Sequence, residues 1–281
     1  MLELEYAELT DSGLKRNHNE DCIGHVIPAS PAQVQSQGWL FALADGVGGQ
    51  EKGEVASRLS IDAVLAGFRK IPKGIMHVSL LPRLVQDANQ AVFDEGNSSN
   101  SRPEPGYVDP GGAILPGGTR MASTLVLCAL RFDSAVVSHV GDSRCYLFRS
   151  GTLSPLTHDH TMVDDQVRMG LISKADAATH ANRHLLTRSL GAEMFVAADT
   201  ITVNILPGDV LLLCSDGLHG YVPDPAIQWM LNSMPDLNDA AAALVAAANT
   251  AGGHDNVSIQ LIRVRAIERM GLYRGRPYRL L

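Results

Sequence analysis

Residues 39–57, WLFALADGVGGQEKGEVAS, begin as an apolar run and end as the start of an amphipathic helix. The run stops on Asp45, and three glycines follow within four residues. Beyond them, apolar residues recur at spacings of three to five, which is the helical period. The stretch therefore predicts a buried strand over 39–45, a turn almost free of side chains, and a helix over 53–70. The strand would deliver a carboxylate to its own end.

Further along the chain, short strand patterns alternate with helical ones. Strands are expected at 22–27, at three β-rich runs between 123 and 156, at DVLLLCSDG, and at NVSIQLIRV as the last strand. Helices are expected at 77–93, as a short pair within 161–180, and as a pair within 225–251. The close spacing of the β-rich runs is typical of antiparallel hairpins. This order predicts a layered α+β sandwich rather than a doubly wound parallel sheet.

Composition limits the classes of protein to consider. The 281 residues can bury a sizeable core, and 45% hydrophobic with 19% charged residues is ordinary for a globular protein. A net charge of −7 argues against general nucleic-acid binding. The acidic N-terminal sequence lacks the pattern of a secretory signal, and no apolar run reaches about 18 residues, so we expect no membrane segment and a cytoplasmic location. Four scattered cysteines without a C-x-x-C pair predict buried free thiols.

Two segments stand apart from these patterns. Residues 94–118 are dense in Gly, Pro, Ser and Asn, and we expect a loop or insertion because strands resume after them. Residues 1–264 would then form one catalytic domain. The tail, 265–281, carries five Arg against one Glu, so it is either a solvated extension or a docking strip for an acidic partner or for the protein's own surface.

Five aspartates stand where apolar runs begin or end. Asp45, Asp142 and Asp216 follow such runs and precede a small residue, Asp255 precedes a strand, and Asp21 closes RNHNED. Each alone is typical of a turn, but the repetition predicts that strand ends gather these carboxylates in one place. Their repulsion calls for cations, and oxygen ligands favour Mg²⁺ or Mn²⁺ over zinc. An aspartate shared by two ions would make a binuclear centre that activates water for attack on a phosphoryl group.

A phosphate substrate also needs a positively charged side chain. Arg16 lies five residues before Asp21, and its guanidinium fork could hold two phosphate oxygens. The alternative is a surface arginine without a special partner.

Five segments in order resemble the metal-dependent serine/threonine protein phosphatases of the protein phosphatase 2C type, nearest to their bacterial single-domain branch. They are GLKRNHNED, ALADGVGGQEKGEVAS, SHVGDSRCYLFRSGTLSPLTHDHT, LLLCSDGL and GGHDNVSI, and the resemblance runs from Ala7 to Val264. It implies a four-layer α-β-β-α sandwich with two central, mainly antiparallel sheets flanked by helices. It also implies hydrolysis of phosphoserine and phosphothreonine by a water that bridges two Mg²⁺ or Mn²⁺ ions, without a phosphoenzyme.

The resemblance assigns ligands residue by residue. Asp45 would bridge the two ions, and the carbonyl of Gly46 would bind the second. Asp216 and Asp255 would hold the first ion.

Other matching positions would support this centre. Asp21, with Glu20, would support the second ion directly or through water. Asp142 matches a position that helps hold a third, weaker ion in bacterial members. Arg16 would bind the substrate phosphate, and Asn256 would orient the ligands from behind.

The chain departs from the family pattern at two places. Gln50 stands where many members carry a histidine, and an amide has no proton to give at neutral pH, so direct acid catalysis from this position is lost. Ala122, Ser123 and Thr124 replace the usual Gly-Thr-Thr, in a region that we expect to pack under the site. Residues 161–194 would form a flap over the site, or else a helical hairpin that only packs.

The function implied by the resemblance is a protein-serine/threonine phosphatase acting on phosphorylated proteins. It would oppose a Ser/Thr kinase in bacterial signalling, as a monomer with no nucleic-acid or membrane partner. The alternatives are a catalytically weak module that binds phosphoproteins and a phosphatase for small molecules. An enzyme is favoured because the aspartates for both main ions are all present. The histidines at 139, 158, 160, 184 and 254 lack zinc spacing, so we expect packing or surface roles for them.

Overall fold

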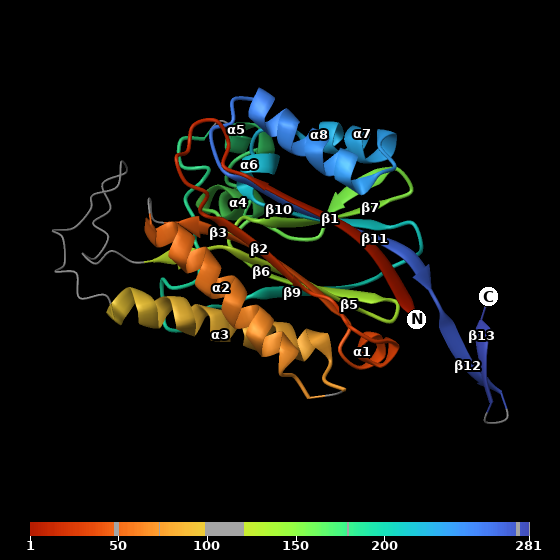
Figure 1. The fold of residues 1–281 in the computed structure, drawn as a ribbon. Coiled ribbons are helices and arrows are strands. Elements are labelled where there is room, and N and C mark those ends of the chain that lie inside the picture. The colour runs from red at the N-terminus through yellow and green to blue at the C-terminus, as the bar shows by residue number, and fades with distance from the viewer. Residues whose placement is uncertain (48–50, 73, 99–120, 179, 274–275, 281) are drawn as a thin grey trace.

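Two β-sheets packed face to face form the centre of the molecule, with helices on both outer faces (Figure 1). The computed structural model describes residues 1–281 except 48–50, 73, 99–120, 179, 274–275 and 281. This architecture is the expected α-β-β-α sandwich. No helix among the described residues is both long enough and apolar enough to cross a membrane.

The first sheet has five strands, all paired antiparallel, and it pairs the first strand of the chain with one that lies far along the sequence. Strand β1 pairs with β11 from Leu2 opposite Ile267 to Asp11 opposite Val257. The sheet continues through β10 and β7 to the edge strand β8. In sheet order the strands are β1 (Leu2–Asp11), β11 (Val257–Ile267), β10 (Val210–Cys214), β7 (Arg144–Arg149) and β8 (Thr152–Pro155).

The second sheet is also antiparallel and contains the strand that carries Asp45. This strand, β3, lies between β2 and β5, and the short β4 pairs with its end. The strands in order are β2 (Asp21–Val26), β3 (Trp39–Val47), β5 (Leu125–Arg131), β6 (Ser134–Val140) and β9 (Asp199–Asn204), with β4 at Ala122–Ser123.

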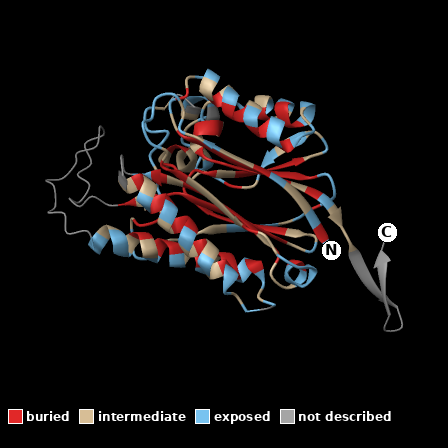
Figure 2. Cartoon of the chain, in the orientation of Figure 1, coloured by how far each residue is buried: buried red, intermediate tan, exposed pale blue. Residues whose placement is uncertain are grey.

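Three apolar clusters hold the layers together. One fills the space between the sheets with side chains such as Phe41, Leu43 and Leu211. A second packs the second sheet against α2 (Glu51–Arg69) and α3 (His77–Ser98), and a third packs the first sheet against α7 (Asp224–Ser233) and α8 (Leu237–Thr250). Figure 2 shows the buried residues concentrated in the strands and the exposed ones on the outer helix faces. Burying both faces of each sheet explains the nearly continuous apolar runs of the central strands.

Four shorter helices complete the described fold. Helix α1 (Pro31–Ser36) starts with Ser30, whose side chain accepts a hydrogen bond from the Gln33 amide, and with Pro at its first position. Helices α4 (Met162–Arg168) and α5 (Lys174–Ala178) are the expected short pair, and α6 (Asp216–His219) follows β10 directly.

The structure corrects several expectations about element boundaries. Strands β1 and β9 were not expected, and NVSIQLIRV is not the last strand. Two more, β12 (Arg269–Tyr273) and β13 (Arg276–Leu280), pair into a ribbon that stands away from the sheets (Figure 1). Helix α3 continues through Ser98, so the first residues of the expected 94–118 insertion are helical, and 99–118 lie outside the described residues. The cysteines are free thiols, three of them buried, as expected.

Candidate active site

An acidic cavity of about 470 Å³ receives residues from both sheets and from the segment after α5. Its walls hold five carboxylates and one arginine. The lining residues are Arg16, Glu20, Asp45, Gly46, Val47, Asp142, His184, Leu186, Asp216, Tyr221, His254 and Asp255. Seven of the ten residues named from the sequence therefore line one cavity.

Strand β3 delivers Asp45, and the residues before β5 hold its peptide in place. The Asp45 amide donates to the Thr124 hydroxyl at 3.0 Å. The Asp45 carbonyl accepts from the Thr124 amide at 2.8 Å and from the Ser123 hydroxyl at 2.9 Å. The segment that departs from Gly-Thr-Thr thus lies under the site, as expected, and keeps two hydroxyls that bond to Asp45.

The glycine after Asp45 allows a close approach by helix α2. The Gly46 amide donates to the carbonyl of Glu20 at 3.1 Å. A Cβ on Gly53 would lie 2.8 Å from the Gly46 carbonyl oxygen and 2.9 Å from Cδ of Glu20. The first turns of α2 therefore fit against the site only because position 53 has no side chain.

Asp21 lies behind the cavity rather than in its wall. It pairs in register with Asp45 across β2 and β3, and it is buried. The Ser215 hydroxyl donates to its Oδ2 at 2.8 Å, whereas Oδ1 is buried without a hydrogen-bond partner among the described residues. Glu20, the residue before it, is the one that reaches the cavity.

Asn256 fastens the loop that carries Arg16. Its Oδ1 accepts from the Glu20 amide at 2.8 Å, and its Nδ2 donates to the carbonyls of Ser12 and His18 at 3.0 and 2.9 Å. Arg16 extends from this loop and donates from Nη2 to Oδ2 of Asp255 at 2.9 Å. The predicted phosphate ligand therefore lies beside a predicted metal ligand.

The buried carboxylates perturb one another. Burial, with the charges of Asp21 and Asp216, raises the pKa of Asp45 well above its ordinary value. Burial and the charge of Asp216 do the same to the pKa of Asp142. Burial alone would raise the pKa of Asp216 as well. The contact with His184 and other nearby charges outweigh burial, so the pKa of Asp216 is lowered. Such opposed pKa values are typical of functional carboxylate clusters.

The donor set fits divalent metal ions. The cavity offers carboxylate oxygens and a backbone carbonyl, which are the ligands of Mg²⁺ and Mn²⁺, and behind it lies Oδ1 of Asp21, a buried oxygen that no described residue satisfies. Five carboxylates face one guanidinium in the cavity walls, so cations would relieve a large unbalanced charge. The cavity walls therefore suit the binding of divalent cations.

Sequence reasoning missed five residues of the wall, which are Val47, His184, Leu186, Tyr221 and His254. His184 and Leu186 come from the expected flap, and Nδ1 of His184 lies 3.6 Å from Oδ2 of Asp216. Tyr221 stacks on His254 with ring centroids 5.7 Å apart. The only signal for them was proximity in sequence to the DGVGG, SDG and GGHD motifs or the flap. Gln50 lies outside the described residues.

Comparison with known proteins explains this arrangement. A family model described as "Protein phosphatase 2C" matches residues 17–261. The chain belongs to the protein phosphatase 2C family. Among its relatives, the serine/threonine phosphatase stp of Listeria welshimeri is 33% identical over 256 residues, which are 90% of this chain and 93% of that protein.

Solved phosphatase structures agree with the fold as well. The Mycobacterium tuberculosis serine/threonine phosphatase PstP/Ppp superimposes with a TM-score of 0.79 at 30% identity, covering 95% of this chain and 100% of that one. The catalytic domain of PstP in complex with two manganese ions gives a TM-score of 0.77 at 30% identity over the same shares. The chain is thus a protein-serine/threonine phosphatase of a family that uses Mn²⁺ or Mg²⁺.

Proposed function

We propose that this phosphatase 2C protein hydrolyses phosphoserine and phosphothreonine in cytoplasmic proteins, as a monomer that opposes a Ser/Thr kinase in bacterial signalling. The acidic cavity with Arg16 at its wall carries the proposal, because it combines ligands for hard cations with a group for phosphate. The net charge of −7 is consistent with a partner that is neither nucleic acid nor an anionic membrane.

The residues of the cavity would act as ligands of different ions. Asp45 would bridge two of them, Asp216 and Asp255 would complete the first site, and the Gly46 carbonyl would serve the second. When bound, the divalent cations supply an activated water by lowering its pKa and neutralise the surrounding carboxylates. Glu20 and Asp21 would support the second site, the former from the cavity wall and the latter from behind.

Asp142 and Asn256 would act at the margins of this centre. Asp142 lines the cavity and would contribute to a third, weaker ion site. Asn256 forms hydrogen bonds to residues on both sides of Arg16 in this loop. It would therefore keep the guanidinium at a fixed distance from the carboxylates.

Arg16 would bind the substrate phosphate. It lies on the cavity wall, and its contact with Asp255 raises its pKa, so it remains charged. Its guanidinium can bind two phosphate oxygens while the phosphorus faces the carboxylates and the phosphoester bond points away from them, as in-line attack by water requires. Orienting the ester in this way accounts for a rate increase without any covalent bond to the protein.

The decisive experiment measures phosphate release from a phosphothreonine peptide and from p-nitrophenyl phosphate, with Mn²⁺ and with chelator. We expect chelator-sensitive release from the peptide, and Arg16→Ala should raise KM about ten- to hundredfold through loss of charged hydrogen bonds. Calorimetric Mn²⁺ binding to Asp45→Asn and Asp255→Asn should be weakened independently of turnover. No release from any substrate would leave a phosphoprotein-binding module, and release only from small esters would leave a small-molecule phosphatase.

A further inference from the structure

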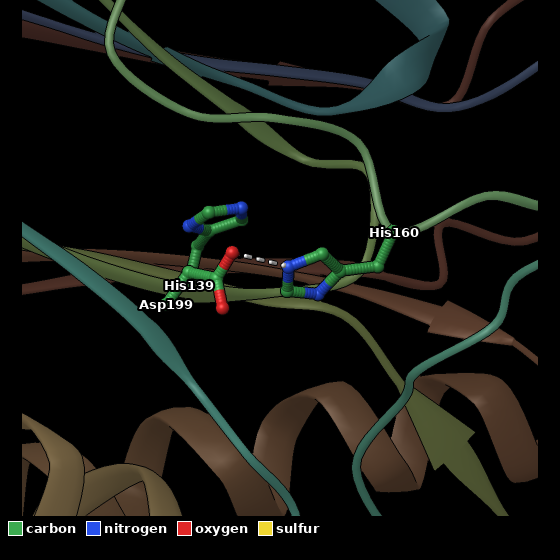
Figure 3. Close-up of side chains that lie close together, drawn as sticks. All are labelled: His139, His160 and Asp199. Atoms are coloured by element: carbon green, nitrogen blue, oxygen red, sulfur yellow. Dashed lines mark ion pairs between the residues drawn. The ribbon is translucent and has the colours of Figure 1, made fainter. Parts of the chain in front are cut away.

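Two histidines and an aspartate meet outside the acidic cavity, beside the flap. His139 belongs to β6, His160 precedes α4, and Asp199 begins β9 (Figure 3). Both histidines are buried, and their rings stack with centroids 4.6 Å apart and an angle of 24°. The three side chains also lie close enough together to share a metal ion. Their hydrogen bonds decide whether they form a metal site.

Both ring nitrogens of His160 are already engaged. The amide of Gly141 donates to its Nδ1 at 3.2 Å, so Nδ1 carries the lone pair. In a neutral ring the hydrogen then sits on Nε2, which lies 3.3 Å from Oδ2 of Asp199 (Figure 3). Burial, with the neighbouring His139, lowers the pKa of His160 to about 4, which keeps the ring neutral. The lone pair of His160 is therefore already used within the protein and is not available to a metal.

Arg188 supplies the positive charge of the cluster. Its Nη1 donates to Oδ1 of Asp199 at 2.9 Å and lies 3.4 Å from Nε2 of His160. A metal ion at this place would meet the guanidinium at short range and be repelled by it. We assign the cluster to hydrogen bonding and not to metal binding.

These residues stand at the neck of the flap. His160 and Arg188 flank the part of the expected flap, 161–194, that contains α4 and α5. The two arms of the neck meet in a β-bridge between Thr161 and Leu186, and the Thr187 amide donates to the His160 carbonyl at 2.8 Å. Because Leu186 lines the acidic cavity, the position of the neck determines how the flap faces the site.

The same neck is tied to the peptide before a cavity aspartate. Gly141 donates its amide hydrogen to His160 Nδ1, and its carbonyl accepts from the His160 amide at 3.0 Å. Asp142 follows Gly141 directly and lines the cavity. His160 thus contacts the flap neck, β9 and the approach to Asp142 at once.

We infer that His160, Arg188 and Asp199 form a clamp that positions the flap relative to the phosphatase cavity. They are positioning residues, since the described cavity walls do not include them. A phosphopeptide is much larger than an aryl phosphate, so more of it would lie outside the cavity and against the segment 161–188. Loosening the clamp should therefore weaken the binding of phosphopeptides and leave the hydrolysis of aryl esters nearly unchanged.

Asp199→Asn tests the clamp because it keeps the shape of the side chain and removes its charge. KM for a phosphothreonine peptide should rise about three- to tenfold, the range expected for such coupling, while kcat for p-nitrophenyl phosphate stays within about twofold. Hydrogen exchange should quicken at amides of 162–186 and stay unchanged in β10. Unchanged KM and unchanged flap exchange in Asp199→Asn would overturn the inference.

Two substitutions of His160 separate the clamp's contacts. His160→Gln places an amide near the position of Nε2 and can keep the contact with Asp199, whereas His160→Asn places an acceptor near Nδ1 and can keep only Gly141. We expect His160→Gln to keep hydrogen exchange in the flap and KM for the peptide near their wild-type values. We expect His160→Asn to raise both. The reverse order would contradict the clamp.

A matched control removes a similar ion pair elsewhere. Arg149 donates to the two carboxylate oxygens of Asp209 at 2.9 and 2.6 Å. Asp209 lies just before β10, whereas Asp216 follows the other end of that strand. Asp209→Asn should lower stability without changing flap exchange or peptide KM. An equal effect of Asp209→Asn on both readouts would show that general destabilisation, and not the clamp, controls the flap.

Discussion

Asp21 should make the metal-free protein less stable as the pH rises. Burial, with the nearby charge of Asp216, raises the pKa of Asp21 from 3.8 to about 7. The folded protein therefore keeps a proton that the unfolded chain releases near pH 4, so the unfolding free energy falls between about pH 4 and pH 7. At 1.36 kcal/mol per pKa unit the full effect is about 4 kcal/mol, of which about 3 kcal/mol falls between pH 5 and pH 8.

The assay is urea unfolding of wild type and Asp21→Asn in chelator at pH 5, 6.5 and 8. Buried neutral histidines such as His77 and His160, with pKa values of about 4, act in the opposite direction below pH 6.5. They are present in both proteins and cancel in the difference. The unfolding free energy of Asp21→Asn relative to wild type should rise by about 3 kcal/mol from pH 5 to pH 8.

Any hydrogen bond or packing that the asparagine fails to reproduce is missing at every pH, so the slope reports the charge of Asp21 together with its effect on the pKa of Asp45. Saturating Mn²⁺ should reverse the order at pH 8, because the wild-type carboxylate then has a cation to serve. A difference between the two metal-free proteins that does not depend on pH would refute the reasoning.

Three further predictions concern the neighbours of the cavity. Gly53→Ala should weaken Mn²⁺ binding about tenfold by calorimetry, because its Cβ would press on the Gly46 carbonyl; wild-type affinity would show that α2 can retreat. Thr124→Val should cost about 1–3 kcal/mol in urea unfolding, since the Asp45 amide loses its acceptor; a cost near zero would mean that water replaces the hydroxyl. Gln50→His should speed turnover of phosphopeptides more than that of an aryl phosphate, whose leaving group hardly needs a proton, and equal effects in steady-state kinetics would sink that idea.

The carboxylate cluster could be predicted from sequence because its signal is local. Each aspartate stands beside an apolar run, which alone is typical of a turn, and the repetition of this local pattern at five places is what predicts the cluster. The register of β2 on β3, which places Asp21 opposite Asp45, was not predicted, because recognising two strands does not fix how they pair. The sandwich followed from the alternation of helices with closely spaced strands.

The parts that escaped prediction depend on partners far away in the chain. Strand β9 is an edge strand whose residues are mostly exposed, so no apolar pattern marks it. His184 reaches the cavity from the segment after α5, far in sequence from the other wall residues, and His160 is defined by contacts with Gly141, Arg188 and Asp199. Spacing along the chain says nothing about such contacts.

The pairing of β1 with β11 has a consequence for synthesis of the protein. Arg16 and Asp21 follow β1 near the start of the chain, whereas Asp255 precedes β11 near its end. The cavity cannot be assembled before Asp255 is made, since Arg16 and Asp21 are made earlier and must wait for it. A ribosome-bound fragment therefore has no complete catalytic centre, and phosphatase activity would begin only after translation has passed β11.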